Sequence, residues 1–382
     1  MKITDVRALS LSRKHEPERE WYSASFHVYK ADCSILIIET DEGMQGIGEP
    51  SAYGVPPDIA AKVEEIGPML LGRDPTEPGL MSAIMGERSM DTTYAGLDCA
   101  LWDLKGKIAE KPVAQLLAGS ERKPLEKVRL YASAGVRYDW DKEPESIVEE
   151  ACSFAEMGLT TYKMRIGTDW KWSGVTVDRF LQLARKVYEA VGARMQPALD
   201  ANCRLEVDQA LEVAAALDEM GWAWFEEPTA RDPEVWKRIN DSVEMPISGC
   251  EPFTMIAQFG PYLERKSVDI VQPDAGVCGI STCMKVGAQA HEQGILLIPH
   301  NWHNGLMTMA NAHMVAALPE PRFCELNMMQ GPLQWDILAE KPVIEDGFLV
   351  LPDKPGLGVE LAEDLEERFP YIDAPWGVRM ER

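Results

Sequence analysis

Length, composition and charge exclude several classes of protein. The chain has 382 residues, long enough for a large core and two domains. Its formal net charge of −24 argues against nucleic acid or an anionic membrane as a partner, because both bind basic surfaces. No apolar run approaches the ~20 residues that span a bilayer, and early charges make the N-terminus unlike a secretory signal. We therefore expect a cytoplasmic globular protein, and the negative charge does not exclude a small anionic substrate, because a metal and a few basic side chains can reverse the local sign.

The first third of the chain predicts an α+β domain. Residues 28–50 contain two alternating apolar stretches around a turn, as in an antiparallel hairpin. The preceding residues 15–27 are polar with interspersed aromatics, and we expect a loop there. From about 58 to 117 the apolar spacing becomes helical. We place this domain at 1–125 and expect the segment of about 340–382 to return and complete it.

The middle of the chain alternates short β-prone runs with helical stretches. Eight strands are expected at about 25-residue spacing, from 128–135 at the start to 322–327 at the end. This count and alternation predict a closed (β/α) barrel over residues 126–339. No helix is expected after the eighth strand, where a hairpin-like stretch follows instead.

Three acidic residues end consecutive predicted strands. Asp200, Glu226 and Glu251 follow each other by 26 and 25 residues, the length of one strand–helix unit. Carboxylates at the same end of adjacent parallel strands converge, and they repel each other unless a cation lies between them. Oxygen ligands favour Mg²⁺ over zinc, and the eight cysteines show no zinc-binding spacing. The sequence therefore predicts a magnesium site. Cys250 and Cys324 directly precede Glu251 and Glu325, so strand alternation turns them toward the helices, and we expect both to be reduced, buried thiols.

The other strand ends also carry polar groups at the barrel period. Lys163 and Arg165 are two residues apart on one strand, so both face the same side. Asp274 precedes His300 by one strand, an arrangement in which a carboxylate orients an imidazole as a general base. Glu325 ends the eighth strand. Catalysis in such barrels occurs at these strand ends.

These groups together favour one reaction class. A metal and Lys163 can stabilise the enediolate that forms when a proton is removed next to a carboxylate. His300 with Asp274 is the expected base, and His303 is a rival at the same mouth. The sequence thus predicts proton abstraction next to a carboxylate. The alternative from another functional class is a binding protein: a barrel that binds an anion or a metal but catalyses no reaction.

At this point the residues resemble the enolase superfamily, and within it the mandelate racemase-like subgroup. The matching motifs are ALWDLKGK, ALDAN, FEEP, SGCE, VQPD, IPH, CEL and PGLGVE, which cover nearly the whole chain. The resemblance implies an α/β fold: a modified (β/α)7β TIM-type barrel with an α+β capping domain. It also implies Mg²⁺ on the three strand-end acids, a dyad of Asp274 and His300, and a hydrogen bond from Glu325 to the enediolate.

The resemblance also implies the kind of substrate. Family dehydratases act on acid sugars, which are anionic and hydroxylated, and the loops 21–27 and 48–53 would cover such a molecule. A homo-oligomer, as a dimer or an octamer, is implied as well. The candidate substrate contacts are Trp21, Tyr53, Asn202, Trp302 and His303.

One position departs from the family pattern. Where members that invert a stereocentre have a second Lys, this chain has Arg165, and a guanidinium is a poor proton shuttle. Dehydration needs only one base, so we expect an aldonate or aldarate to be converted to a 2-keto-3-deoxy acid. A cycloisomerase or epimerase of a sugar acid or its lactone is the alternative.

Overall fold

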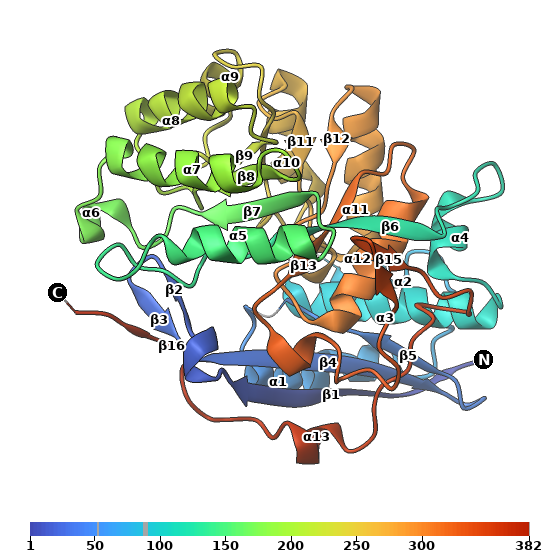
Figure 1. Cartoon of the computed structure of the whole chain (residues 1–382). Coiled ribbons are helices and arrows are strands. Elements are labelled where there is room, and N and C mark those ends of the chain that lie inside the picture. The colour runs from blue at the N-terminus through green and yellow to red at the C-terminus, as the bar shows by residue number, and fades with distance from the viewer. Residues whose placement is uncertain (52, 87–90, 382) are drawn as a thin grey trace.

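An antiparallel sheet in the order β1-β4-β5 carries the N-terminal cap (Figure 1). The structure, a computed structural model, describes residues 1–51, 53–86 and 91–381. In β4, Ile35 and Ile37 pack toward the barrel while Leu36 and Ile38 pack toward the cap helices, because successive strand side chains face opposite sides. The sheet is therefore buried on both faces. Its strands are β1 (Ile3–Lys14), β4 (Lys30–Thr40) and β5 (Gln45–Gly48).

The cap helices connect the sheet to the barrel. Asp91 begins the longest of them by accepting hydrogen bonds from two backbone amides of its first turn. Farther along this helix, Asp98 accepts a hydrogen bond of 2.7 Å from the Ser281 hydroxyl in the barrel. The expected helical region is thus confirmed. The helices are α1 (Pro56–Ile66), α2 (Leu80–Met85), α3 (Thr92–Ile108) and α4 (Val113–Ala118).

A second small sheet occupies the segment that we expected to be a loop. Strand β3 pairs with β2 on one side and with β16, from the far end of the chain, on the other. The loop expectation for residues 15–27 was therefore wrong. It failed because β3 gains a partner about 350 residues away, which no local pattern reports. The strands are β2 (Trp21–Ser23), β3 (Phe26–Val28) and β16 (Gly377–Arg379).

Eight parallel strands form the barrel. Backbone pairing runs from β13 to β6 and then in chain order to β12. The Asn301 side chain bridges the seam between β12 and β13, donating to the backbone oxygen of Glu325 at 2.9 Å. The strands are β6 (Lys127–Ser133), β7 (Thr161–Arg165), β8 (Gln196–Asp200), β9 (Phe225–Glu226), β10 (Ile247–Gly249), β11 (Ile270–Val271), β12 (Leu296–Leu297) and β13 (Phe323–Asn327).

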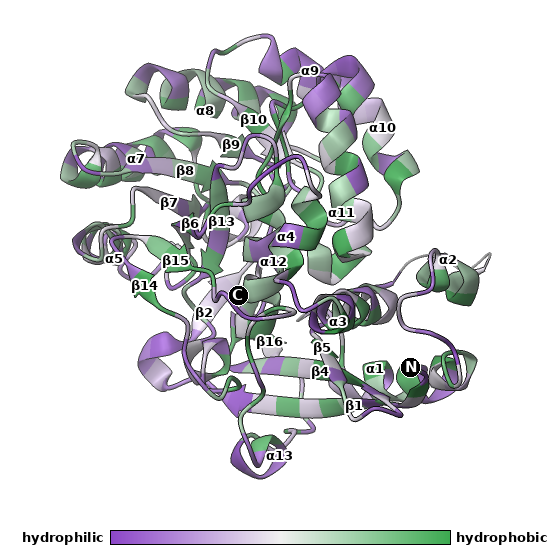
Figure 2. Cartoon of the chain, turned by 90° about the vertical axis from the view of Figure 1, so that its right-hand side faces the viewer, coloured by the Kyte–Doolittle hydropathy of each residue, from purple (hydrophilic) through white to green (hydrophobic). Residues whose placement is uncertain are grey.

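Helices surround the barrel and alternate with its strands. Figure 2 shows hydrophilic and hydrophobic bands on the outer helices α7 and α8, whereas every residue of α12 is buried. After β13 the described residues form a short 3₁₀ turn (Gly331–Gln334) in place of an eighth helix, which confirms the (β/α)7β arrangement. The helices are α5 (Ser146–Glu156), α6 (Trp170–Ser173), α7 (Val177–Val191), α8 (Val207–Met220), α9 (Pro233–Asn240), α10 (Ile256–Arg265), α11 (Ala275–Glu292) and α12 (Gly305–Ala317).

The end of the chain returns along the molecule. The hairpin of β14 (Ile344–Glu345) and β15 (Phe348–Val350) adds to the barrel strand β6 rather than to the cap sheet. After the short helix α13 (Leu365–Arg368), Pro370 bridges to Leu11 of β1. The tail thus contacts both parts of the structure before it forms β16.

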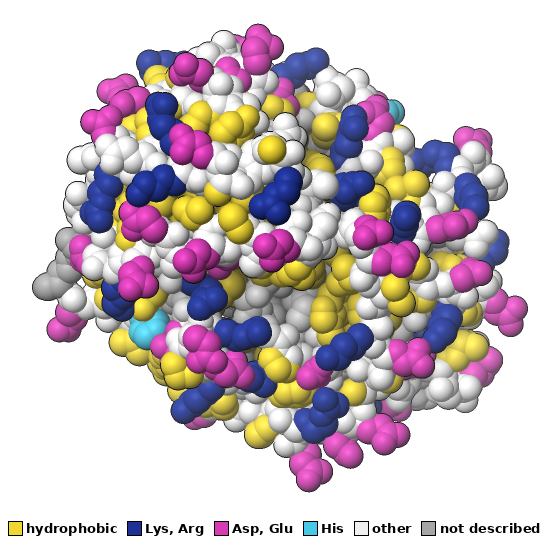
Figure 3. Space-filling view, in the orientation of Figure 1, with side chains coloured by type: hydrophobic (Ala, Val, Ile, Leu, Met, Phe, Trp, Pro, Cys, Tyr) yellow, Lys and Arg dark blue, Asp and Glu magenta, His cyan; other side chains and the backbone are white. Residues whose placement is uncertain are grey.

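The barrel interior and the molecular surface have different compositions. An apolar cluster fills the inside of the barrel, and Cys250 and Cys324 are buried free thiols, as expected. On the face in Figure 3, Lys and Arg side chains are interspersed with Asp and Glu. No helix among the described residues is both long and apolar enough to span a bilayer. The interior cluster consists of Tyr131, Ala198, Trp224, Ile270 and Ile298.

A buried histidine links the cap, the barrel and the tail. His313 in α12 accepts a hydrogen bond from the amide of Ala114 at 3.2 Å and lies 3.0 Å from the backbone oxygen of Leu357. These contacts require a neutral ring with the proton on Nε2. Burial lowers the pKa of His313 to about 4, although the contact with Leu357 raises it slightly.

We predict that acid weakens this link. The pKa of His313 is lower in the folded state than its value of 6.5 in an unfolded chain, so its stabilisation is complete above pH 6.5 and is lost as the pH falls toward 4. At pH 5 the expected cost is about 2 kcal/mol. Calorimetric melting of the wild type and His313→Gln between pH 7.5 and 5 should show the variant losing less stability. The control His291→Gln changes an exposed ring and should melt with the wild-type pH dependence; equal losses in all three proteins would contradict the prediction.

Candidate active site

The three strand-end acids converge in the barrel mouth. Ligand oxygens of Asp200, Glu226 and Glu251 all lie within 4.8 Å of one another. Glu251 Oε2 is buried and has no hydrogen-bond partner among the described residues. Burial, with the neighbouring carboxylates, raises the pKa of Glu251 to about 8 although His300 lowers it. Three crowded carboxylates with an unpartnered oxygen suit a divalent metal ion.

Local backbone geometry aims Glu251 into this group. The preceding residue, Cys250, has a φ of 82°, a conformation that costs a non-glycine residue about 1–3 kcal/mol. The cysteine side chain is buried, and Glu251 turns back toward the barrel axis. Strain of this kind persists where the surrounding structure fixes the residue.

Two cations from β7 face the same carboxylates. Lys163 Nζ lies 2.5 Å from Glu226 Oε1 and 3.0 Å from Glu325 Oε1. Arg165 Nη1 lies 3.0 Å from Asp200 Oδ2, in an ion pair without the alignment of a hydrogen bond. Burial lowers the pKa of Lys163 and of Arg165, but the carboxylates outweigh it and hold both values above normal. Both side chains therefore remain charged.

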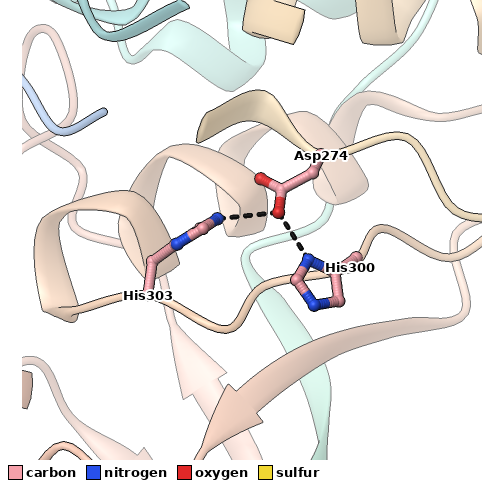
Figure 4. Close-up of side chains that lie close together, drawn as sticks. All are labelled: Asp274, His300 and His303. Atoms are coloured by element: carbon pink, nitrogen blue, oxygen red, sulfur yellow. Dashed lines mark hydrogen bonds and ion pairs between the residues drawn. The ribbon is translucent and has the colours of Figure 1, made fainter. Parts of the chain in front are cut away.

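Asp274 holds two imidazoles at once (Figure 4). Its Oδ2 atom lies 2.5 Å from His300 Nδ1 and 2.7 Å from His303 Nε2. Its Oδ1 atom accepts a hydrogen bond from the amide of Gly276 at 2.7 Å, at the start of α11. Burial raises the pKa of Asp274, but the two imidazoles outweigh it and lower the value to about 2. The carboxylate is thus ionised and fixes the orientation of both rings.

His300 points its other nitrogen into the mouth. Nε2 is buried, lies 3.4 Å from Glu251 Oε2 and has no hydrogen-bond partner among the described residues. Burial lowers the pKa of His300, but Glu251, Glu325 and Asp274 raise it to about 10. Across the mouth, Glu325 Oε2 accepts a hydrogen bond of 2.7 Å from the amide of Asn301.

A cavity of about 140 Å³ opens above this group. Arg165 and four predicted contacts, Trp21, Tyr53, Asn202 and Trp302, line it. The fifth, His303, is fully buried beside Asp274 and is absent from the described lining.

Aromatic rings and one loop border the cavity. The Trp302 ring lies 4.7 Å from the Arg165 guanidinium and packs edge-on against Trp21. Tyr53 is 64% exposed and its ring centroid lies 6.5 Å from that of His300, so it covers the mouth from the cap. Ala52, in the loop 48–53 that we expected to cover the substrate, lies outside the described residues.

Sequence reasoning missed several residues that support the site. Trp224 and Gln272 donate hydrogen bonds of 3.3 and 2.6 Å to Glu226 Oε2. Trp224 could have been found, because it lies two residues before Glu226 and so faces the same side of the strand. Glu49 accepts the amides of Asn304 and Met307 at the start of α12, a contact from the cap that no spacing reports.

Comparison with known proteins gives the family. The model described as enolase C-terminal domain-like matches residues 146–365. The model for the mandelate racemase / muconate lactonizing enzyme N-terminal domain matches residues 10–118. The chain therefore belongs to the enolase superfamily, in its mandelate racemase / muconate lactonizing enzyme subgroup.

Similar proteins carry out related reactions. Arabinonate dehydratase of Saccharolobus solfataricus is 33% identical, over 87% of this chain and 89% of the relative. D-galactarolactone cycloisomerase of Agrobacterium fabrum is 31% identical, over 98% of this chain and 100% of the relative. The solved structure of the 3,6-anhydro-D-galactonate cycloisomerase from Zobellia galactanivorans has a TM-score of 0.82 at 26% identity, covering 97% of this chain and 99% of that one. The chain is thus an enolase-superfamily enzyme that acts on a carboxylate.

We predict that the acidic triad gives the protein metal-dependent stability. At a Mg²⁺ concentration ~100-fold above Kd, binding to the folded state should add roughly 2.7 kcal/mol. Asp200→Asn and Glu251→Gln should each lose most of this gain, measured as the difference in melting temperature with Mg²⁺ and with a chelator.

Glu227→Gln is the matched control for this measurement. Glu227 is a buried carboxylate directly after Glu226, but both of its oxygens accept hydrogen bonds from Arg231. The variant should melt at a lower temperature and still gain stability from Mg²⁺. An unchanged Mg²⁺ effect in the two triad variants would show that the ion binds elsewhere.

Proposed function

We propose that this enzyme dehydrates an acid sugar, with His300 removing the proton next to the carboxylate. The observation that carries the proposal is the environment of His300 Nε2, which is buried in the mouth and makes no hydrogen bond among the described residues; Glu251 Oε2, an oxygen of the triad, lies 3.4 Å away. The two other basic groups, Lys163 and Arg165, are held in closer ion pairs, at 2.5 and 3.0 Å. One base is enough for dehydration, whereas inversion of a stereocentre requires a second base on the opposite face.

The proposed roles follow from charge and position. Asp200, Glu226 and Glu251 would hold Mg²⁺, which when bound supplies Lewis-acid stabilisation to the substrate carboxylate. Lys163 lies between Glu226 and Glu325, where it can donate to the same carboxylate as negative charge develops on it. Glu325 lies across the mouth; burial raises its pKa, but Lys163, His300 and Arg165 outweigh it and lower the value, so Glu325 must take up a proton before it can donate a hydrogen bond to the enediolate.

The proton balance needs only one imidazole. A divalent ion on the triad would offset the charge of Glu251, the first of the carboxylates that raise the pKa of His300, and so favour the neutral ring. His300 Nε2 then accepts the proton from the carbon next to the carboxylate, and Asp274 stabilises the imidazolium that results. The same nitrogen then returns the proton to the β-hydroxyl, which leaves as water. The resulting enol rearranges to the 2-keto-3-deoxy acid. Asp274 stays ionised throughout because two imidazoles and one amide donate to it.

A cycloisomerase is the second candidate. The observation in its favour is the 31% identity, over 98% of this chain, to a D-galactarolactone cycloisomerase. That reaction would also start from proton removal by His300, but its leaving group is the lactone oxygen. The two functions differ in product. Dehydration of an open-chain acid releases a 2-keto acid. Cycloisomerisation consumes a lactone and releases no 2-keto acid.

We predict that His300→Asn abolishes formation of the 2-keto product. Loss of the base should lower kcat by about 10²–10⁴-fold with Mg²⁺ present, while the Mg²⁺-dependent gain in melting temperature remains. The measurement is a screen of acid sugars for 2-keto product with wild type and variant. Turnover retained in the variant would transfer the role of base to His303.

We also predict that His303 supports the reaction through Asp274. His303→Phe removes one buried donor to Asp274, which should lower kcat by about 10–100-fold. KM should change little, because the His303 ring is absent from the described lining of the cavity. His303→Gln can place an amide nitrogen near the position of Nε2 and should recover much of kcat. A variant that changes KM alone would instead make His303 a substrate contact.

A further inference from the structure

Residues of the cap and the tail form a large part of the cavity lining. We call this region the distal subsite and define it by His15, Trp21, Lys30, Asp32 and Trp376, which all line the cavity. Successive ring contacts lead from the barrel part of the lining to the tail: the Arg165 guanidinium lies 4.7 Å from the Trp302 ring, and the Trp21 ring lies 5.7 Å from Trp302 and 6.3 Å from Trp376. A substrate bound by its carboxylate at the triad would place its far end here.

The distal subsite contains a lysine, Lys30, whose positive charge is already balanced by the carboxylate of Asp32. Lys30 Nζ lies 3.1 Å from Asp32 Oδ1 and donates to the backbone oxygen of Ile372 at 2.6 Å. The Lys30 side chain is fully buried, while the Asp32 side chain keeps 12% of its surface exposed. Ser12 donates to the same Asp32 oxygen at 2.5 Å. The group that this pair presents to the cavity is thus a carboxylate and not an ammonium.

The other walls of the subsite carry no net charge. Burial lowers the pKa of His15 to about 4, so its ring is neutral near pH 7. The rings of Trp21 and Trp376 stack with centroids 6.3 Å apart and offer apolar faces to the C–H groups of a ligand. A neutral imidazole and a carboxylate can both hydrogen-bond hydroxyl groups.

The floor of the cavity also lacks spare positive charge. Lys163 is shared by two carboxylates, and Arg165 is paired with Asp200. Five buried or nearly buried acids lie in the mouth with these two cations, so a divalent ion leaves the floor one negative charge in excess, with neutral imidazoles, before the reacting carboxylate binds. The acids are Asp200, Glu226, Glu251, Asp274 and Glu325.

We infer that the substrate carries one carboxylate and a neutral, hydroxylated far end, as an aldonate or its cyclised form does. This rests on the proposed function. A second carboxylate, as in an aldarate, would face Asp32 and find no unmatched cation among the described residues of the cavity. Asp32 is therefore the repulsive element that excludes dicarboxylates, and its hydrogen bonds with hydroxyl groups favour the neutral end.

The experiment compares two acids that differ in the last carbon alone. D-galactonate and galactarate are offered to the Mg²⁺-loaded enzyme, and 2-keto product is measured for each. The expected result is a kcat/KM for galactonate at least about tenfold higher, the size of one moderate electrostatic penalty. Equal or faster turnover of galactarate would overturn the inference and leave the proposed dehydration intact.

If neither acid is turned over, the relative binding of the two acids tests the inference. Each acid is then titrated into the Mg²⁺-loaded protein and the shift in melting temperature is recorded. Binding of galactonate with weaker or absent binding of galactarate supports the inference even where dehydration fails. Tighter binding of galactarate, or no binding of either acid, overturns it.

A specificity variant tests the assignment to Asp32. Asp32→Asn removes the repulsive charge and leaves Lys30 unmatched, so the ratio of kcat/KM for galactonate over galactarate should fall about tenfold or more. The control Glu145→Gln breaks an exposed ion pair with Lys186 and should leave the ratio unchanged. An unchanged ratio in a folded Asp32→Asn protein would remove Asp32 from the recognition of the far end. If that variant does not fold, the wild-type ratio alone decides.

Discussion

The structure depends on holding several buried carboxylates in one barrel mouth. Each is compensated in a different way: Glu226 and Glu325 share Lys163, Asp200 pairs with Arg165, and Asp274 binds two imidazoles. The triad still lacks enough positive charge without an ion, because isolated charges are costly to bury. In the proposed function, metal binding, orientation of the base and stabilisation of the reacting carboxylate are therefore parts of one electrostatic arrangement.

The barrel and the cap divide the site between them. The floor comes from strand ends that follow each other at an even period, and it defines the chemistry. The walls come from β2, β4 and the tail at 371–376, which approach one another only in the folded chain. Lys30 shows this division clearly, because its ammonium pairs with Asp32, two residues away in β4, and donates to Ile372, over 340 residues away in the tail. The discrimination between substrates that we infer is accordingly built from non-local contacts.

This division explains what could be predicted from the sequence. The barrel, its eight strands and the convergence of the triad follow from periodicity, since strand ends at a constant spacing must meet at one rim. The small sheet and the distal subsite could not be predicted, because β3 pairs with β16 and Lys30 bonds to Ile372 across nearly the whole chain. The second partner of Asp274 was also missed: His303 had been expected to contact substrate or to rival His300, and its bond to Asp274 depends on how the loop after β12 turns.

The position of β16 has a consequence for how the protein matures. Because β16 completes the sheet over the cavity and Trp376 forms part of its wall, residues 371–379 must leave the ribosome before the pocket has its full shape. The barrel strands, by contrast, are all synthesised by residue 327. The floor of the cavity can thus assemble during translation while its roof is still missing, and the selection among acids that we infer would be acquired last.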